Sequence, residues 1–449
     1  MSDRREFLRT SAALAASAGA LPPLAPDLDA TPSYRPSARP PVRLSPEDPV
    51  RIGVIGTGGM GTGHIESFLA ARKDGRMNVE IVALADVCQP RLEAARKKVD
   101  EAQVAGAGTG TGAGTGPAPA TASCATYTKY AELLARKDVQ GVLIASPEHW
   151  HSQMAIDAIR AGKDVYCEKP MTRFLRDAFR LLDETNAHPG IIVNVGTQFV
   201  VSPSTFEARR IIEEGVIGKP VWSQTSYCRN SKDGEWLYYE IDPQWQPGVN
   251  LDWDAWCGPM PREPWNPEVY ARWRRYRKWS TGIIGDLLVH KMTPLVYAIG
   301  LGWPTRVVAS GGHYIDKKME NHDQVNINVE FENEHTMVVA GSTANQEGLP
   351  TVIRGHRANL FLDGRRIRLQ PEQLFANEIE ERTVDGEDHG DDQDELRRRW
   401  LDAIRTRGPS PSPVELAAKV MVIVELASRS MWEGAAFSFD PGHRKVRKL

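Results

Sequence analysis

The chain lacks any surplus of positive charge: 55 lysines and arginines stand against 58 aspartates and glutamates in 449 residues. Proteins that bind DNA or RNA need a basic surface that neutralises phosphate groups. The sequence also lacks an apolar run of about 20 residues, the length that a helix needs to cross a bilayer. We therefore expect no nucleic-acid partner, no binding to anionic lipid and no membrane span.

Cysteine is scarce as well. The sequence indicates neither a zinc knuckle nor a disulfide framework, because no two cysteines have C-x-x-C spacing. We expect no metal site, and we expect the cysteines to be small buried side chains. They are Cys88, Cys124, Cys167, Cys228 and Cys257.

The length of the chain predicts two domains behind a leader, because single hydrophobic cores stop growing at roughly 250–300 residues. We expect residues 1–47 to be a leader and tether, residues 48–172 to be a first domain and residues 173–449 to be a second.

The leader contains a candidate export signal. Arg4-Arg5 and a following Phe-Leu pair precede an alanine-rich stretch at residues 11–21 and a proline-rich tether at residues 22–47. This order resembles a twin-arginine export signal and predicts a periplasmic protein that folds in the reducing cytosol before export. A flexible basic N-terminus is the alternative.

After residue 50 the pattern becomes strand, glycine turn, helix, strand. Apolar runs at residues 52–55 and 81–85 flank a helical stretch at residues 62–72, which predicts a βαβ unit. The turn reads G-x-G-x-x-G, in which small residues let the amides of a helix N-terminus approach a diphosphate. Its residues are Gly56, Thr57, Gly58, Gly59, Met60 and Gly61.

Asp86 ends the second strand, 25 residues after Gly61. A carboxylate at this place accepts hydrogen bonds from the adenosine ribose and repels a 2′-phosphate. We therefore expect NAD as the cofactor rather than NADP. The alternative is a plain strand-to-helix turn with Asp86 as a helix cap.

The alternation of predicted strands and helices continues after an insertion. Residues 103–123 are rich in Gly, Ala, Thr and Pro and are expected to be a disordered insertion. Beyond them we expect helices at residues 130–134 and 152–161 and strands at residues 140–145 and 164–167.

Two polar segments follow the last two of these strands. Ligands of a doubly wound sheet lie at the carboxyl ends of its strands, so both segments should face the cofactor. The cofactor-binding candidates in them are Ser146, Pro147, His149, His151, Glu168 and Lys169.

The glycine turn, the string SPEHWH, the string AGKDVYCEKP and the later string DLLVH occur in that order. This succession resembles the Gfo/Idh/MocA superfamily, the group of glucose–fructose oxidoreductase and inositol dehydrogenase, over roughly residues 48–440. The resemblance implies an α/β fold with an N-terminal Rossmann dinucleotide-binding domain and a C-terminal α/β domain that has a large, mostly antiparallel open sheet. It also implies an oxidoreductase acting on CH–OH groups, with Lys169, Asp286 and His290 as catalytic residues.

The chemistry of these side chains agrees with that assignment. Hydride transfer from a carbinol needs a proton acceptor at the hydroxyl group. Histidine titrates near neutral pH, so His290 is the preferred acceptor and Lys169 the polarising and relaying partner. Asp286 lies one helical turn before His290 and is expected to orient the imidazole or hold a second hydroxyl. The alternatives are a surface ion pair at Glu168-Lys169 and a core histidine at position 290.

The sequence departs from the family pattern after His290, where Thr293 and Pro294 stand in place of a common acidic residue. We expect the helix to restart there, with Thr293 as N-cap and Pro294 at the first helical position. Lys291 adds a cation that lowers the pKa of His290 or binds an acidic substrate.

The second half of the chain is strand-rich, and Asp363-Gly364 is a strong hairpin signal. An open antiparallel sheet is able to pair protomers, so we expect a homo-oligomer. Nine of the twelve tryptophans fall between residues 222 and 303, where they form a loop core or a sugar-binding wall. The basic run at residues 272–278 is interpreted as a solvated face, with binding of carboxylate-bearing sugars as the alternative.

Three functions are compatible with these patterns. The first is an NAD-dependent oxidoreductase acting on a hydroxyl of a sugar, glycoside or polyol, with a tightly bound cofactor because no free nicotinamide pool is expected outside the cytoplasm. The second is a redox-neutral NAD-dependent glycosidase or lyase that oxidises a sugar transiently and then eliminates a group. The third is a sugar-binding protein without turnover.

Overall fold

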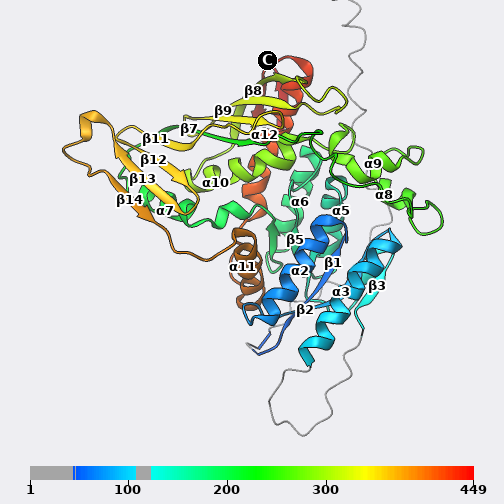
Figure 1. Ribbon diagram of the computed structural model, residues 1–449. Helices are drawn as coiled ribbons and strands as arrows, with labels where there is room; N and C mark the ends of the chain where they lie inside the picture. Colours follow the sequence, from blue (N-terminus) through cyan, green and yellow to red (C-terminus); the bar gives the residue numbers. More distant parts are fainter. Residues whose placement is uncertain (1–43, 46, 108–122) are drawn as a thin grey trace, which may run out of the picture.

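The computed structural model describes residues 44–45, 47–107 and 123–449 (Figure 1). The predicted export signal, almost all of the tether and most of the expected insertion lie outside these residues. The start of the insertion was predicted wrongly, because helix α3 (Gln89–Ala107) continues through residues 103–107. Among the described residues, no helix combines the length and the apolar character of a membrane span.

The first half of the chain forms a six-stranded parallel sheet in the order β3-β2-β1-β4-β5-β6, with helices on both faces (Figure 1). Covered parallel strands read as continuous apolar runs, and β4 and β5 are buried throughout. The sixth strand lies after residue 172, where the first domain was expected to end. The strands are β1 (Val50–Ile55), β2 (Val79–Ala85), β3 (Ala125–Tyr127), β4 (Gly141–Ile144), β5 (Asp164–Cys167) and β6 (Val193–Val195). The remaining helices are α2 (Gly59–Lys73), α4 (Tyr130–Leu134), α5 (Glu148–Arg160) and α6 (Leu175–Ala187).

The second half forms a ten-stranded sheet in the order β14-β13-β12-β11-β7-β10-β9-β8-β15-β16, in which only the β7–β10 pair is parallel. The predicted hairpin after Asp363 is confirmed as the turn between β12 and β13. The strands are β7 (Pro220–Cys228), β8 (Pro304–Gly312), β9 (Gln324–Phe331), β10 (His335–Ser342), β11 (Thr351–Gly355), β12 (Ala358–Asp363), β13 (Arg366–Pro371), β14 (Arg382–Asp385), β15 (Phe437–Asp440) and β16 (Lys445–Lys448).

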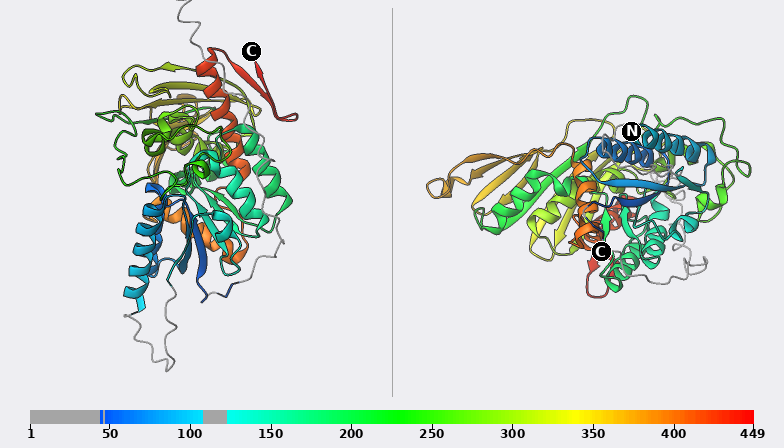
Figure 2. Two further views of the ribbon diagram at one scale, coloured as in Figure 1. Left: turned by 90° about the vertical axis from the view of Figure 1, so that its right-hand side faces the viewer. Right: turned by 90° about the horizontal axis from the view of Figure 1, so that it is seen from below.

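Helices pack against one face of this large sheet. Helix α12 (Val414–Glu433) contacts β8 and β15, α10 (Val289–Ile299) contacts β7, and α7 (Pro203–Glu213) contacts β12 and β13. Strand β9 alternates buried and accessible residues along its length, as expected for a sheet with one covered face. The β12–β14 end of the sheet projects beyond the rest of the molecule (Figure 2).

Helix α11 (Asp392–Thr406) ties the two halves together. It belongs to the C-terminal half of the chain but buries Leu396, Trp400 and Ile404 in the core of the Rossmann sheet, together with Val54 and Leu143. The relative position of the two domains therefore rests on a shared hydrophobic core.

The tryptophan-rich segment builds a small core of its own beside the parallel sheet. Five of its tryptophans are each less than 10% exposed and pack with Cys88 and Tyr270. Trp253 and Trp256 are stacked with ring centroids 4.6 Å apart. These side chains therefore fill a loop core instead of presenting free indole faces to a sugar; they are Trp245, Trp253, Trp256, Trp273 and Trp279.

Candidate active site

The glycine turn after β1 has room for a ligand at two of its glycines. Gly56 has φ +90°, and a Cβ there would lie 2.7 Å from the carbonyl carbon of Ala145. A Cβ on Gly61 would lie 1.8 Å from the oxygen of Gly56, so these two glycines serve close packing. A Cβ on Gly58 or Gly59 would meet no atom closer than 3.6 Å. The side of the turn formed by these two residues is therefore open.

Helix α2 begins at this open side, and its N-cap residue Gly58 makes no side-chain capping bond. The first amides of a helix have no partner within the helix and carry its positive dipole end, which suits an anion. The turn thus fits the diphosphate of a dinucleotide, with Thr57 and Met60 beside the open glycines.

Asp86 fixes the turn from the end of β2. One carboxylate oxygen accepts the backbone N–H of Thr57 at 2.6 Å and its hydroxyl at 3.0 Å. The other oxygen accepts the N–H of Cys88 at 2.8 Å. The carboxylate thus stands between the glycine turn and the chain that leaves β2, where the adenosine ribose of a dinucleotide lies in this fold.

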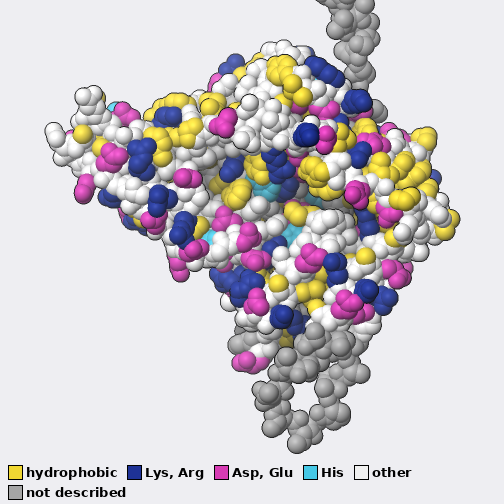
Figure 3. All heavy atoms as spheres, viewed as in Figure 1, with side chains coloured by type: hydrophobic (Ala, Val, Ile, Leu, Met, Phe, Trp, Pro, Cys, Tyr) yellow, Lys and Arg dark blue, Asp and Glu magenta, His cyan; other side chains and the backbone are white. Residues whose placement is uncertain are grey.

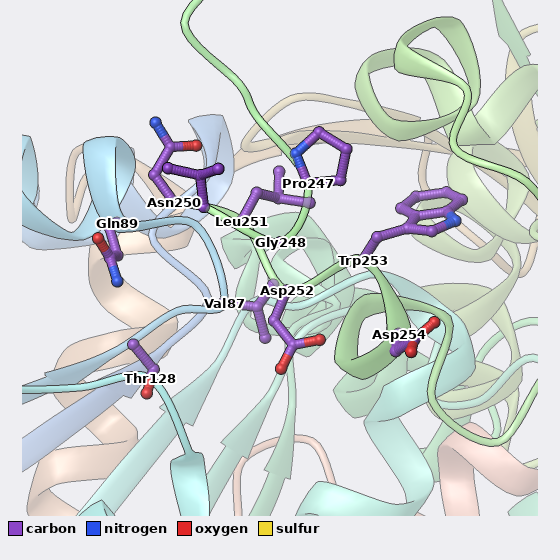
Figure 4. A pocket seen from close by; sticks show the side chains of 11 residues that line it. Val87, Gln89, Thr128, Pro247, Gly248, Asn250, Leu251, Asp252, Trp253 and Asp254 are labelled. Atoms are coloured by element: carbon purple, nitrogen blue, oxygen red, sulfur yellow. The ribbon is translucent and has the colours of Figure 1, made fainter.

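A cavity of about 510 Å³ opens beside Val87, the residue that follows Asp86 (Figure 4). One wall is formed by Val87, Gln89 and Thr128, and the other by residues 247–254 of the C-terminal half. The two walls are hydrogen-bonded: Asp252 N–H donates to Val87 O at 3.0 Å and Gln89 N–H donates to Asn250 O at 2.8 Å. Sequence patterns did not indicate this contact, because the paired residues lie far apart in the chain.

The carboxyl ends of the strands face a hollow between the two domains, and Lys, Arg and His side chains line it (Figure 3). Lys169, just after β5, donates from Nζ to the backbone oxygen of Asp286 at 2.8 Å and to its Oδ1 at 3.1 Å. Arg274 Nε donates to the same Oδ1 at 2.8 Å. Burial acts to raise the pKa of Asp286, but the two cations outweigh it and hold the pKa below its ordinary value.

His290 lies beside this group and is 7% exposed. Its ring faces Phe199 and Tyr227 at centroid distances of 5.9 and 6.3 Å. Its Nδ1 has no hydrogen-bond partner among the described residues. Burial, reinforced by the charge of Lys169, lowers the pKa of His290 to about 3. The imidazole is therefore neutral at physiological pH and has a free nitrogen.

The expectation that Asp286 orients the imidazole of His290 was wrong. The carboxylate is committed to Lys169 and Arg274 instead. The reason is local: residues Ile284–Leu288 form a π-helical turn, η4, so the α-helical register that places residues i and i+4 together does not apply there.

The expected restart of the helix at Thr293 was also wrong. Helix α10 runs from Val289 to Ile299 with Pro294 inside it. The Thr293 hydroxyl donates back to Val289 O at 2.6 Å instead of capping a new helix. The irregular turn lies upstream, in η4, and carries Asp286.

Glu168 turns into the protein interior rather than toward the hollow. It is 3% exposed, and its Oε1 lies 2.9 Å from His64 Nε2. Arg397 of α11 donates to His64 Nδ1 at 2.8 Å, so Nε2 carries the proton and donates to Glu168. Burial acts to raise the pKa of Glu168, but the hydrogen bond from His64 and the charge of Lys169 outweigh it and lower the pKa to about 2.

The hydrogen-bonded series of side chains from Arg397 through His64 to Glu168 ends next to the catalytic candidate Lys169. Glu168 Oε2 accepts the backbone N–H of Lys169 at 3.1 Å. Neither His64 nor Arg397 was predicted as a site residue from the sequence. A signal for His64 existed, since it shares a buried helix face with Phe68 and Ala71 at i, i+4 and i+7. Arg397 had none, because its partner lies on the other domain.

The two histidines of the SPEHWH segment support the walls of the site, contrary to the expectation that both face the cofactor. The His151 ring bridges two carbonyl oxygens, at 2.7 Å from Pro170 O and 2.8 Å from Ser146 O. His149 donates from Nε2 to Trp256 O at 2.8 Å and packs edge-on against Trp256 and Trp279. Neither ring is more than 6% exposed. Pro147 precedes α5 as its N-cap residue.

Several buried polar atoms around the hollow have no protein partner in the described part of the chain. Nearly all buried polar atoms in folded proteins are hydrogen-bonded, so each unpaired one is a candidate partner for water or a ligand. They are Ser146 Oγ, Glu148 Oε2, Thr281 Oγ1 and His290 Nδ1.

The basic run at residues 272–278 is not the solvated face that was expected. Four of its side chains are engaged in ion pairs, and Arg275 and Arg274 are buried or nearly so. The pairs are Arg272 with Glu268, Arg274 with Asp286, Arg275 with Asp316 and Lys278 with Glu263. In the described ranges no cluster of three or more His, Cys, Asp or Glu side chains is arranged to hold a metal ion.

Glu148, the first residue of α5, is fully buried. Its Oε1 accepts the N–H of Thr281 at 2.9 Å, and Arg173 Nε lies 3.8 Å away. Burial raises the pKa of Glu148 from 4.5 to about 7, against the opposing charge of Arg173.

This shift predicts a pH-dependent effect of Glu148→Gln. The folded-state pKa is raised, so the carboxyl stabilises the fold at low pH and loses that contribution as the pH rises from 4.5 through about 7. The melting temperature of the variant relative to the unmodified protein should therefore rise across this interval. Thermal unfolding below and above the interval measures it, and a difference independent of pH would contradict the burial argument.

Comparison with known proteins agrees with this arrangement. Residues 50–197 match the family model described as the oxidoreductase family, NAD-binding Rossmann fold, and residues 260–438 match its C-terminal alpha/beta domain. Inositol 2-dehydrogenase of Gluconacetobacter diazotrophicus is 33% identical over 168 residues, which are 37% of this chain and 42% of that protein. Inositol 2-dehydrogenase/D-chiro-inositol 3-dehydrogenase of Shouchella clausii is 30% identical over 202 residues, which are 43% of this chain and 51% of that protein. The chain thus spans about half the length of the curated relatives it matches.

Solved structures share the fold over a longer range. Levoglucosan dehydrogenase in complex with NADH matches with a TM-score of 0.64 and 17% identity, covering 87% of this chain and 99% of that chain. An NAD binding oxidoreductase from Klebsiella pneumoniae matches with a TM-score of 0.63 and 20% identity over the same shares. With both family models matched in order, the chain belongs to the Gfo/Idh/MocA oxidoreductase family and carries its NAD-binding Rossmann domain followed by its C-terminal α/β domain.

Proposed function

We propose that the protein is an NAD-dependent oxidoreductase that oxidises a secondary hydroxyl of a sugar, glycoside or polyol. The observation that carries the proposal is the meeting of Lys169, Asp286 and the unpaired His290 at the strand ends that follow a dinucleotide turn. Relatives named inositol 2-dehydrogenase and levoglucosan dehydrogenase support the substrate class.

In the proposed reaction, side chains of the protein bind the hydroxyl and take its proton, while the hydride goes to the cofactor. A bound NAD would supply a hydride acceptor, so a carbinol that loses its hydride to it and its hydroxyl proton to the protein would become a ketone. Lys169 is positioned to donate to the hydroxyl oxygen while Asp286, itself fixed by Arg274, holds the ammonium in place. The neutral imidazole of His290, beside Lys169, is positioned to take the proton.

We further propose that NAD stays bound between turnovers. The segment at residues 247–254 reaches across from the C-terminal half and is hydrogen-bonded to Val87 and Gln89 beside the expected ribose position. A dinucleotide in this cavity would be covered from both domains, and its release would require these bonds to open. Tight binding suits the export that Arg4-Arg5 predicts, and cell fractionation would test that export.

Gly58→Ala tests the cofactor site without disturbing the fold. Gly58 has φ −67°, which alanine adopts freely, and the nearest atom to its added Cβ is 3.6 Å away. The methyl group would instead meet the bound diphosphate. We expect the affinity for NAD to fall by about 10-fold or more, which corresponds to about 1.4 kcal/mol. Isothermal titration with NAD and native mass spectrometry of the purified protein measure it.

Gly63→Ala is the matched control, because it lies on the same helix and an added Cβ meets no atom within 4 Å. It should leave NAD binding unchanged. A protein that binds no NAD in any form, or a Gly58→Ala variant with unchanged affinity, would overturn the proposed cofactor site.

A redox-neutral reaction is the second candidate function. A relative named 2,7-anhydro-N-acetylneuraminate hydratase, from Mediterraneibacter gnavus, is 23% identical over 244 residues, which are 54% of this chain and 55% of that protein. In such a cycle a transient ketone acidifies the neighbouring C–H, and a base such as His290 removes that proton before a group is eliminated. Release of an aryl alcohol from aryl glycosides without net NADH formation would favour this candidate.

We also infer that protomers associate through the large sheet, because the helices of the described residues cover only one of its faces (Figure 2). Analytical ultracentrifugation would show a single monomeric species if this inference is wrong.

A further inference from the structure

The positive charge around the catalytic candidates exceeds the negative charge. Lys169 and Arg274 share one carboxylate, that of Asp286. Lys291, next to His290 in the chain, has no carboxylate within ion-pair distance in the described part of the molecule. With Glu168, whose charge also acts on His290, three cations stand against two anions at this end of the hollow, although the whole chain has a net charge of −3.

Lys291 is directed toward the proposed reaction centre. Its Nζ lies 4.6 Å from the centroid of the Phe199 ring and 5.8 Å from that of the Tyr227 ring. The same two rings flank the imidazole of His290. The ammonium of Lys291 and the imidazole of His290 thus contact the same two aromatic rings, so a molecule whose hydroxyl reaches His290 has its neighbouring groups near Lys291.

Arg229 also acts on His290 by its charge, but Glu235 balances that charge. Arg229 donates to the Tyr227 hydroxyl at 2.9 Å and pairs with Glu235 at 3.0 Å. Glu235 is also bonded by Ser231 and Tyr238, so its charge is fully engaged on this side. The Arg229 guanidinium also lies over the Tyr227 ring, with its Cζ 5.0 Å from the ring centroid, so it contacts the same ring as Lys291.

We propose that the substrate carries a carboxylate which binds Lys291, with its reacting hydroxyl at Lys169 and His290. This inference rests on the proposed oxidoreductase function and narrows the substrate class to sugar acids such as hexuronates. A single ammonium beside aromatic rings matches one carboxylate, whereas phosphate groups are usually gripped by several Arg forks or by a helix N-terminus.

The test compares matched pairs of sugars on the NAD-loaded full chain: D-glucuronate against D-glucose and D-galacturonate against D-galactose. The unmodified protein should have the higher kcat/KM for the acid of at least one pair. Lys291→Met keeps the apolar stem but removes the charge, and it should reduce the acid-to-neutral ratio of kcat/KM by about 10-fold or more, mainly through KM.

Lys419→Met is the control. Lys419 also lies near an aromatic ring, with Nζ 5.9 Å from the Trp303 centroid, but it is ion-paired with Glu415 on α12. It should leave the acid-to-neutral ratio unchanged. Titration calorimetry with the same acids gives a second readout that does not depend on turnover.

The outcomes separate this inference from the function beneath it. Turnover of the neutral sugars with no preference for either acid, no binding of either acid by NAD-loaded protein, or an unchanged ratio in Lys291→Met would overturn the carboxylate inference alone. If Lys291→Met lowered kcat/KM for glucose 6-phosphate but not for the uronates, the group bound by Lys291 would be a phosphate. That result would also overturn the carboxylate inference. Failure to bind NAD would instead overturn the proposed function.

Discussion

Lys169→Met should lower kcat by about 100-fold or more while NAD remains bound. The ammonium donates to both the carboxylate and the backbone oxygen of Asp286, and it is the cation nearest to the turn after β5. Methionine preserves the apolar stem but donates no hydrogen bond, so the substrate hydroxyl would lose its orienting partner. Initial rates of NADH formation measure kcat, and native mass spectrometry measures bound NAD.

Lys163→Met separates this effect from a loss of stability. Lys163 is 7% exposed and also donates to backbone oxygens, but these belong to Arg136 and Val139, away from the hollow. Its replacement should lower the melting temperature and leave the rate per folded molecule intact. If Lys169→Met retained the full rate, Lys169 would be an anchor for Asp286 and not a catalytic residue.

The sequence predicted the Rossmann half closely because its signals are local. Strand β5 and helix α4 have the predicted bounds, since each is a short apolar segment between clear breaks in the pattern. The roles of Gly56 and Gly61 followed from the turn itself, where a Cβ would collide with the backbone. Local pattern therefore sufficed wherever an element and its partner are close in the chain.

The active-site details depended on contacts that pattern does not encode. Arg274 reaches Asp286 only because a loop folds back on the π-helical turn η4. No periodic pattern in the sequence predicts such a turn. The chain from Arg397 through His64 to Glu168 joins residues of both domains. The strings that carry the family resemblance located the site, but the partners of each side chain required the three-dimensional structure.

His290→Asn should lower kcat about as strongly as Lys169→Met, by about 100-fold, with NAD still bound. Asparagine fits between Phe199 and Tyr227 and keeps a polar group, but it does not accept a proton. A weakly basic imidazole suffices for this step, because the carbinol hydroxyl becomes far more acidic as its hydride leaves. Since burial lowers the pKa of His290 to about 3, the ring stays neutral and competent in mildly acidic solution. The histidine should therefore cause no loss of kcat/KM between about pH 8 and about pH 5, whereas an exposed histidine would cause one near pH 6.5. A pH profile of the unmodified protein with an acidic limb near that value, absent from His290→Asn, would show that the imidazole titrates in water and does not work from the buried position described above.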